Sequence, residues 1–453
     1  MRILIIGGGI AGSAAALALH KAGFEPVVYE AHPDSAEDLG AFLTLASNGM
    51  RALAQIDAAH LVAEIGFPLT RLRVIDGAGA TIADAPLGDH DDPLTQYRCL
   101  RRADLAAALQ REVARRGIAI RHGARLHSLT ETPTDIGAAP ATERDARLQS
   151  PSETLGSTGI EYGSRLQPPS NTAGDIGTGL GAIEHGARLN TLGDGFGGGS
   201  ITARFADRHS VTGDLLIGAD GLNSTVRALL SDSPVEPRYA GQRVFYGYTV
   251  EAPPEPSGTI TMIRGSGAAF GYACSPDGET LWFARVSGPP VPADEIAAAA
   301  PRQWRDQLVP LLRPDTTPAA DIVQATGDQL MVTNACDLPP GITWGATRAV
   351  IIGDAAHAAS PATGQGASMA LEDAIVLAKA LRDAPTTGEA LNAYERARRP
   401  RVEHNILVSA DLTAGRRPSP QAGPQAAGKD VRVAPLSNDD LVRQLDWTTP
   451  LTS

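Results

Sequence analysis

The N-terminal residues alternate between short apolar runs and breaks that are rich in glycine or alanine. The apolar run at residues 2–6 predicts a strand that is buried on both faces, as in a parallel sheet. The alanine-rich stretch from Ser13 to Ala22 predicts a helix, which Gly23 would end. Residues 26–29 are apolar again and predict a second strand. The pattern therefore predicts a strand–helix–strand unit at the start of the chain.

The break between the first strand and the helix has the spacing G-x-G-x-x-G, at Gly7, Gly9 and Gly12. The first glycine permits a tight turn, the second lets the backbone approach a pyrophosphate, and the third lets helix and strand pack closely. The second strand ends at Glu30, whose carboxylate can accept hydrogen bonds from ribose hydroxyls and would repel a 2′-phosphate. We therefore expect FAD or NAD at this turn. A similar spacing at residues 177–182 follows no predicted strand and carries little weight.

Two later apolar strands also end at a carboxylate flanked by glycine. Residues 215–221 deliver Asp220, for which a helix cap is the simplest interpretation when the motif stands alone. Residues 349–357 deliver Asp354, which could accept hydrogen bonds from ligand hydroxyls. The glycines of segment 364–366 follow, and backbone N–H groups at this helix start would suit the N1/O2 edge of an isoalloxazine.

Together these motifs resemble those of the single-component FAD-dependent aromatic hydroxylases and monooxygenases. The chain carries G-x-G-x-x-G, then G-A-D-G-x-x-S-x-x-R, then G-D-A-A-H-x-x-x-P-x-x-G-Q-G, and residues 102–105 resemble the family's arginine landmark. The family includes p-hydroxybenzoate hydroxylase, salicylate hydroxylase and tetracycline-inactivating monooxygenases. By this resemblance, FAD would be held by Gly7, Gly9, Ala11, Gly12, Glu30, Arg102, Asp220, Asp354, Gly364, Gln365 and Gly366.

The resemblance also implies individual roles for these residues. Arg102 would face the phosphate or ribityl arm of FAD, and Asp354 the ribityl hydroxyls. Asp220 would lie near the pyrophosphate and support productive use of NAD(P)H. Ser368 stands where many relatives carry asparagine, and both residues can hydrogen-bond locally. His357, directly after a strand, is interpreted as structural.

The activity that the resemblance implies is monooxygenation, with FAD as cofactor and NAD(P)H as transient co-substrate. NAD(P)H would reduce FAD, and O₂ would form a flavin C4a-hydroperoxide that hydroxylates or epoxidises a small aromatic or polyketide- or terpenoid-like substrate. No catalytic side chain is predicted, because the cofactor carries the chemistry. Two alternatives stay open: a related flavoenzyme that oxidises, reduces or cyclises without oxygen insertion, and a non-catalytic flavin- or ligand-binding protein. A simple NAD-dependent dehydrogenase is disfavoured by the motifs at Asp220 and Asp354.

The expected fold class is α/β, with a discontinuous Rossmann-like FAD-binding domain and a smaller α+β substrate domain built on an antiparallel sheet. The expected boundaries are 1–75, 96–126, 201–230 and 336–400 for the FAD-binding domain, 76–95 and 231–335 for the substrate domain, 127–200 for a repetitive insertion, and 401–453 for a C-terminal helix and extended tail.

Aromatic residues are concentrated in the expected substrate domain, although aromatics make up only 4% of the chain. Aromatics on half-buried strands are usually core residues, but an enzyme that oxidises flat molecules could also use them as pocket walls. The residues that we consider for such a pocket are Tyr246, Phe270, Tyr272, Trp282 and Pro361.

The segment 127–200 differs from the rest of the chain in composition, being dense in glycine, serine, threonine and proline. The motif H-G-A-R-L at 122–126 recurs at 185–189, and Y-G-S-R-L stands at 162–166. We interpret the segment as an expanded hairpin connection rather than a lid or partner arm, because loop closure costs little more as a loop lengthens. Beyond Ala414 we expect extended chain with a helix at 438–445.

Charge and cysteine content exclude some functions and indicate a compartment. The net charge of −12 argues against nucleic-acid binding and against adhesion to anionic membranes, which need a basic face. The three scattered cysteines form no CxxC pair, so we expect reduced thiols in a cytoplasmic protein and no metal site. No uninterrupted run of about 18 apolar residues predicts a membrane span. The oligomeric state is left open.

Overall fold

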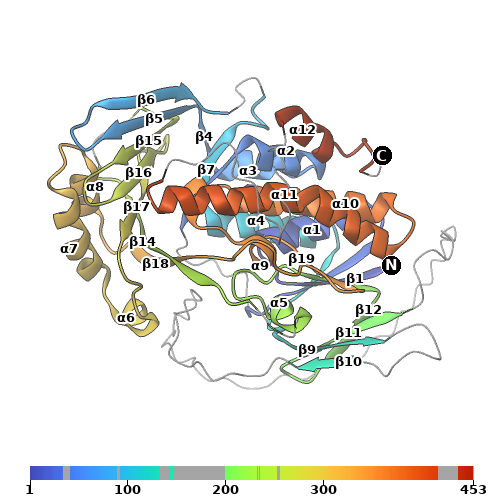
Figure 1. The fold of residues 1–453 in the computed structure, drawn as a ribbon. Coiled ribbons are helices and arrows are strands. Elements are labelled where there is room, and N and C mark those ends of the chain that lie inside the picture. The colour runs from blue at the N-terminus through green and yellow to red at the C-terminus, as the bar shows by residue number, and fades with distance from the viewer. Residues whose placement is uncertain are drawn as a thin grey trace, which may run out of the picture.

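The computed structural model describes residues 1–33, 41–88, 92–132, 142–145, 199–231, 233, 235–252, 256–416 and 437–451. In Figure 1 the paired helices α10 (Gly366–Asp383) and α11 (Thr387–Thr413) cross the middle of the molecule. In this view a parallel sheet lies below them, and a larger, mostly antiparallel sheet lies at the left. This arrangement confirms the predicted α/β fold class.

The parallel sheet is built from the apolar runs that end at glycine or an acid. Its strand order is β19 (Ala349–Ile351), β13 (Leu215–Gly218), β1 (Arg2–Ile6), β2 (Glu25–Tyr29) and β8 (Ala119–Arg121). Ile3, Leu4 and Ile5 are fully buried, so both faces of the sheet are covered. The carboxyl ends of β1, β13 and β19 lie side by side, since Ile6 pairs with Gly218 and Gly218 with Ile351.

Helices with small side chains pack closely around this sheet. Helix α1 (Ile10–Lys21) contacts α10, and Ala14, Ala15, Ala16 and Ala18 of α1 are fully or almost fully buried. The other helices on this side are α2 (Ser47–Gln55), α3 (Ala59–Ile65), α4 (Arg102–Arg115), α5 (Thr225–Leu230), α9 (Asp354–His357), the 3-10 helix η1 (Pro361–Thr363) and α12 (Asn438–Leu445). The observed bounds of α12 are those expected from the sequence.

The larger sheet has seven strands and spans the region expected to hold substrate. Their order is β18 (Leu330–Asp337), β14 (Arg238–Thr249), β17 (Thr280–Ser287), β16 (Ala269–Cys274), β15 (Thr259–Arg264), β5 (Arg71–Asp76) and β6 (Thr81–Pro86). The pair β15–β5 is parallel and the other pairs are antiparallel. The sheet begins at Arg71, ahead of the expected boundary at residue 76.

One face of this sheet packs against helices α6 (Ala293–Ala298), α7 (Pro301–Leu312) and α8 (Ala319–Ala325), at the left of Figure 1. Residues paired across neighbouring strands share a face, and Phe270 pairs with Ala284 while Tyr272 pairs with Trp282. All four belong to the apolar core beneath α7 and α8.

Three of the aromatics considered for a substrate pocket therefore fill the core instead: Phe270, Tyr272 and Trp282. The Trp282 ring lies where a Cβ on Gly247 would be 2.4 Å from it, so the strand beside it has to carry glycine. The Trp282 Nε1 donates to Thr326 Oγ1 at 2.9 Å, which satisfies its polar atom in the core.

The opposite face of the sheet carries Tyr246 and Phe283, which pair across β14 and β17. Both contact Phe42, with ring centroids 6.4 Å and 6.0 Å away. Phe42 belongs to a small sheet of β3 (Phe42–Leu45), β7 (Tyr97–Arg101) and β4 (Phe67–Leu69). This face therefore packs against the small sheet, and we call it the inner face of the seven-stranded sheet.

A fourth sheet lies beside α5 and contains the ends of the expected insertion. Its order is β10 (Thr142–Asp145), β9 (Leu126–Thr132), β11 (Ser200–Phe205) and β12 (Ser210–Gly213). Strands β9 and β11 pair antiparallel, so the segment between them links neighbouring strands, as in an expanded hairpin connection. Residues 133–141 and 146–198, with most of the repeats, fall outside the described residues.

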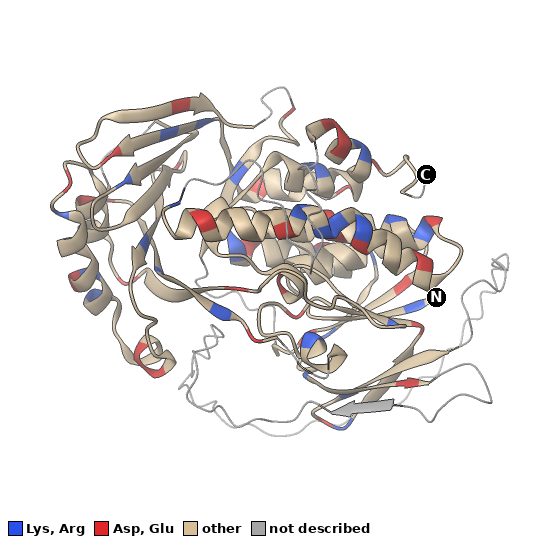
Figure 2. Cartoon of the chain, in the orientation of Figure 1, with Lys and Arg blue, Asp and Glu red and all other residues tan. Residues whose placement is uncertain are grey.

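In the described part of the chain, no helix combines the length and apolarity needed to cross a bilayer. Figure 2 shows acidic and basic residues close together along α10 and α11. Across the same described ranges, no group of three or more histidine, cysteine or acidic side chains is arranged to hold a metal ion.

Candidate functional site

The turn between β1 and α1 is shaped by three glycines with different surroundings. Gly7 has φ +101°, and a Cβ on Gly12 would lie only 1.9 Å from the Gly7 carbonyl oxygen. A Cβ on Gly9, by contrast, would meet nothing within 4 Å. The N-terminus of α1 receives no side-chain cap, so its N–H groups face this open space. A pyrophosphate fits such a turn, because open N–H groups and the helix dipole both favour an anion.

Glu30 lies against the same turn. Its Oε2 accepts a hydrogen bond from the Gly8 N–H at 2.6 Å, and its Oε1 accepts one from His32 N–H at 2.8 Å. Gln110 of α4 donates to the Gly8 carbonyl oxygen at 2.7 Å, while its buried Oε1 has no partner within the part of the chain that the structure describes. An acid and an unsatisfied amide oxygen next to the turn provide acceptors for ribose hydroxyls.

Asp220 follows β13 and holds the start of α5. Its carboxylate accepts hydrogen bonds from Ser224 Oγ at 2.5 Å and from Val226 N–H at 3.0 Å. Burial raises the pKa of Asp220 above its usual value, against these hydrogen bonds, which lower it. Arg227 of α5 donates to the Ala355 carbonyl oxygen at 3.0 Å, which ties this motif to the one after β19. The N-cap residue of α5 is Ser224, whose side chain accepts from the Arg227 N–H, so Asp220 supports the cap through Ser224 and Val226.

The first and third motifs meet at Gly353. A Cβ on Gly353, which has φ +59°, would lie 3.0 Å from the Cβ of Ala11. Asp354 then begins α9, and a Cβ on Gly366 would lie 3.9 Å from the Asp354 Oδ1. The structure therefore brings Asp354 and the start of α10 next to the first glycine turn.

The start of α10 resembles that of α1, since it has no side-chain cap. Gly364 has φ +65°, and a Cβ there would lie 3.3 Å from Thr44 Oγ1 of β3. Asn48 of α2 donates from Nδ2 to Gln365 Oε1 at 3.2 Å, which fixes the Gln365 side chain. Arg102 is the first residue of α4, and its N–H donates to the Ala41 carbonyl oxygen at 2.9 Å.

A cavity of about 810 Å³ lies beside Gln365, between α2, α10, α11 and α12. Asn48 and Tyr97 both line this cavity and hydrogen-bond to Gln365. Burial raises the pKa of the Tyr97 hydroxyl, and its hydrogen bond to Gln365 opposes this.

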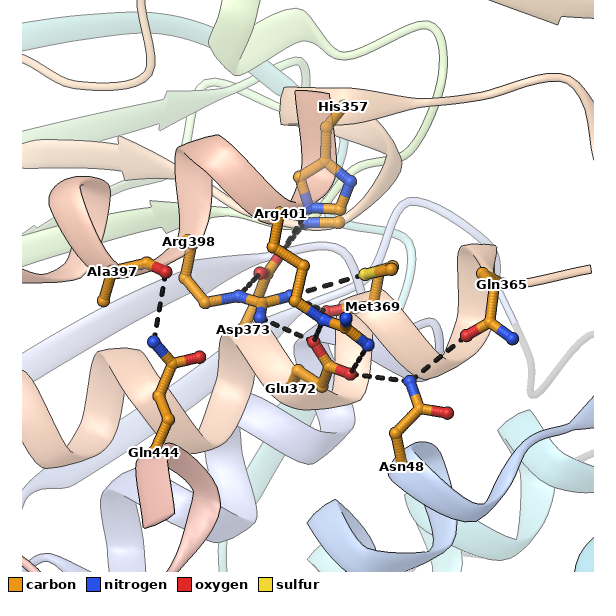
Figure 3. A network of polar contacts seen from close by, with 11 residues as sticks. Asn48, His357, Gln365, Met369, Glu372, Asp373, Ala397, Arg398, Arg401 and Gln444 are labelled. Carbon is orange, nitrogen blue, oxygen red and sulfur yellow. Dashed lines mark hydrogen bonds and ion pairs between the residues drawn. The ribbon is translucent and has the colours of Figure 1, made fainter. Parts of the chain in front are cut away.

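A buried cluster of charged residues joins α10 to α11, and sequence reasoning gave it no role (Figure 3). We call Glu372, Asp373, Arg398 and Arg401 the α10–α11 ion cluster. Arg398 contacts Glu372 at 2.5 Å and Asp373 at 2.8 Å, and these three side chains are fully buried. Arg401 donates twice to Glu372, at 2.8 Å and 2.9 Å.

The α10–α11 ion cluster also holds the turn before Asp354. The Asp373 Oδ2 accepts from the Gly353 N–H at 2.9 Å and contacts His357 Nε2 at 2.5 Å. His357 is therefore structural, as the sequence indicated. Glu372 and Asp373 are adjacent on α10, which buries most of its residues. Acids at buried positions need partners, and this was the one sign of the α10–α11 ion cluster that the sequence offered.

The Asp373 carboxyl should make the stability of the protein depend on pH in the acid range. Burial alone raises its pKa, but His357 and Arg398 outweigh burial and lower the pKa of Asp373 from 3.8 to about 2. Between about pH 4 and pH 2 the Asp373 carboxyl is protonated in the unfolded chain but still ionised in the folded protein. The stability that the ionised carboxylate contributes is therefore complete above this window and is lost as the pH falls through it.

We expect Asp373→Asn to flatten the pH dependence of the unfolding free energy in that window, by up to about 1.4 kcal/mol per pH unit. Urea unfolding curves of both proteins across the window provide the measurement. Asp321→Asn, at the exposed ion pair with Arg313, serves as the control. Equal slopes for the Asp373→Asn variant and the parent would contradict the prediction.

Comparisons with known proteins agree with this geometry. The family model described as "FAD binding domain" matches residues 178–409, just over half of the chain, and one described as "NAD(P)-binding Rossmann-like domain" matches residues 5–39. The aurachin C monooxygenase/isomerase of Stigmatella aurantiaca is 27% identical over 410 residues, which cover 90% of this chain and 88% of that protein. An FAD-dependent urate hydroxylase of Mycolicibacterium vanbaalenii is 26% identical over 431 residues, covering 92% and 90%.

Solved structures share the fold. Klebsiella pneumoniae HpxO, complexed with FAD and uric acid, superposes with a TM-score of 0.67 at 22% identity, over 92% of this chain and 89% of that one. The tetracycline destructase Tet(51) gives a TM-score of 0.56 at 17% identity, over 91% and 90%. At these identities the likeness concerns the fold alone.

Proposed function

We propose, from the premise that this chain belongs to the FAD binding domain family of flavin-dependent hydroxylases and monooxygenases, that it uses NAD(P)H and O₂ to insert one oxygen atom into a small, flat organic substrate. The convergence of three motifs at one edge of the parallel sheet is the observation that carries the proposal. A Cβ on Gly7 would lie 3.0 Å from the Asp220 Cα, and a Cβ on Gly353 would lie 3.0 Å from the Cβ of Ala11.

This edge can hold FAD along its length. The open turn at Gly9 and the uncapped start of α1 would take the pyrophosphate, and Glu30 the adenosine ribose. Asp354 would accept hydrogen bonds from the ribityl hydroxyls, and the uncapped start of α10 would face the isoalloxazine. Arg102 would neutralise the phosphate charge, and Asp220 would fix the wall beside it. When bound, FAD supplies electron transfer from NAD(P)H and oxygen activation at C4a.

The relatives support oxygen insertion and leave the substrate open. One is named as a urate hydroxylase, others as a monooxygenase/isomerase acting on aurachin C and as zeaxanthin epoxidases. Their named substrates differ in size and polarity, which fits a fold whose pocket walls vary while the flavin site stays the same. We infer that the pocket of this chain lies between the flavin edge and the inner face of the seven-stranded sheet, near Tyr246 and Pro361.

An absorption spectrum followed by NADH and NADPH oxidation assays with a panel of phenols tests the function. We expect flavin bands, oxidation of one reduced nucleotide that rises when substrate is added, and an oxygenated product that carries label from ¹⁸O₂. A colourless protein that cannot be reconstituted with FAD would refute the proposal. Flavin bands with substrate-stimulated turnover but no label in the product would favour the family's non-oxygenating chemistry instead.

A further inference from the structure

The inner face of the seven-stranded sheet carries an arginine with buried N–H groups that find no hydrogen-bond acceptor among the described residues. In β17, Arg285 pairs with Val244 of β14 and Ala269 of β16, so it shares this face with Tyr246 and Phe283. The Arg285 Nε and Nη1 are both buried and have no hydrogen-bond partner. A guanidinium has five N–H donors, and leaving buried ones unsatisfied costs free energy. The arrangement indicates a missing acceptor.

No carboxylate among the described strand neighbours fills that place. The residues across from Arg285 are apolar, and the diagonal neighbours are Tyr246, Gln242 and Gly271. Burial lowers the pKa of the Arg285 guanidinium, and the Tyr246 hydroxyl is the one group that raises it. A folded protein rarely buries an unpaired charge unless a ligand completes the pair.

On either side of Arg285, the inner face contacts segments of the chain that we propose lie near the flavin. On one side Gln242 of β14 donates to the Thr413 carbonyl oxygen at 3.0 Å, and the Thr413 hydroxyl contacts Ser360 beside Pro361 at 2.7 Å. On the other side Tyr246 contacts Phe42 of β3, the strand that leads to Thr44 and the Gly364 turn. Val244, the partner of Arg285, lies between Gln242 and Tyr246 on the same strand face.

The surroundings of Arg285 suit an aromatic anion. Tyr246, Phe283 and Phe42 form an aromatic cluster next to it. Burial raises the pKa of the Tyr246 hydroxyl to about 12, although the positive charges of Arg285 and Arg102 act to lower it. The neutral Tyr246 hydroxyl therefore remains a hydrogen-bond donor near neutral pH. A guanidinium and a phenol hydroxyl together can bind one anionic oxygen, while the rings cover a flat ligand.

We propose that Arg285, with Tyr246, selects a flat substrate that carries a negatively charged oxygen, such as an aryl carboxylate, and holds it facing the flavin edge. This inference rests on the proposed function, since it places the substrate of that reaction. Arg285 touches the substrate and determines specificity, and it takes no part in the oxygen transfer itself.

Calorimetric titration of the FAD-loaded protein tests this site without relying on turnover. The probes are benzoate, its neutral analogue benzamide, and inorganic phosphate. We expect benzoate to bind at least about tenfold more tightly than benzamide, because a charge-assisted hydrogen bond exceeds a neutral one. Arg285→Gln should weaken benzoate binding by about ten- to a hundredfold and change benzamide binding by less than about threefold. Arg285→Lys should retain part of the benzoate affinity.

Arg264→Gln is the matched control, because Arg264 lies in the same cross-strand row of the sheet but is exposed. It should leave all three affinities unchanged. Equal binding of benzoate by Arg285→Gln and the parent would overturn the inference. The inference would also be overturned if inorganic phosphate bound more tightly than benzoate and this binding depended on Arg285. Such binding would indicate a site for the phosphates of a dinucleotide.

The two proposals can fail separately. Benzoate binding that depends on Arg285, in a protein that oxidises no NAD(P)H with any substrate, would support the inference and count against the monooxygenase function. Substrate-stimulated turnover of neutral phenols, with no preference for benzoate, would leave the function and overturn the inference.

Discussion

Gly12→Ala is expected to abolish FAD binding and to destabilise the protein. The added Cβ would lie 1.9 Å from the Gly7 carbonyl oxygen and 3.0 Å from its carbonyl carbon, so the turn or the helix has to move. Overpacking of this kind costs about 1–3 kcal/mol, while alanine in a helix interior gains at most about 1 kcal/mol over glycine. We expect a net loss of stability and a displaced pyrophosphate turn. The ratio of flavin to protein absorbance and the thermal midpoint measure both effects.

Gly9→Ala separates cofactor binding from folding. Its Cβ would meet no protein atom within 4 Å, so the fold should be unaffected. The same Cβ would enter the space where the pyrophosphate approaches, and FAD affinity should fall by at least about tenfold. A Gly12→Ala variant that retains parental flavin content, or a Gly9→Ala variant that unfolds at a lower temperature without FAD, would contradict this view of the turn. Gly388→Ala, in open space on α11, is the control.

Arg398→Met should be among the most destabilising single substitutions in the described part of the chain. It removes the guanidinium that contacts Glu372 and Asp373, all three side chains being fully buried. Breaking a buried ion pair by removing one partner costs about 3–5 kcal/mol, because the remaining charge is left uncompensated. Glu372 keeps Arg401 and Asp373 keeps His357, so we expect a loss near the lower end of this range. Urea unfolding of the FAD-loaded and FAD-free protein measures the cost.

The exposed pair of Arg313 and Asp321 provides the comparison for Arg398. Its N–O distance is 2.7 Å, close to those of the buried pairs, but both side chains are more than half exposed. Surface pairs contribute about 0–1 kcal/mol, so Arg313→Met should change the unfolding free energy by less than about 1 kcal/mol. If both arginine variants lose similar stability, burial is not the reason for the effect of Arg398.

Arg398→Met should also weaken FAD binding, because the α10–α11 ion cluster holds the turn that carries Asp354. Asp373 accepts from the Gly353 N–H, and the position of Gly353 next to Ala11 aligns two motifs. A titration with FAD at a temperature where the variant is folded tests this effect separately. Unchanged FAD affinity in a destabilised variant would confine the role of the α10–α11 ion cluster to stability.

The edge of the parallel sheet where we propose that FAD binds could be predicted as a candidate site because its signals are local. Each of the three motifs pairs an apolar strand with a glycine or an acid within a few residues, so residues such as Gly12 and Asp354 are identifiable without their partners. The family resemblance then arranges the motifs along one edge. The contact of Gly353 with Ala11, by contrast, is visible only in the structure.

The two faces of the seven-stranded sheet could not be assigned from the sequence. Alternation along β14 and β17 places Tyr246 and Trp282 on opposite faces, but it does not tell which face the helices α7 and α8 cover. For the same reason Phe270 and Tyr272 were considered as pocket residues, whereas the unpaired Arg285 was missed. The α10–α11 ion cluster escaped notice because its acids and arginines lie on different helices.

The strand order of the parallel sheet has a consequence for how the chain folds during synthesis. Strands β1, β2, β8, β13 and β19 begin at residues 2, 25, 119, 215 and 349, so the sheet is complete only after more than three quarters of the chain has left the ribosome. Until β19 arrives, the edge of β13 stays unpaired and can associate with other chains. The FAD site that we propose includes Asp354, which directly follows β19, so this site is complete only after the last strand has paired.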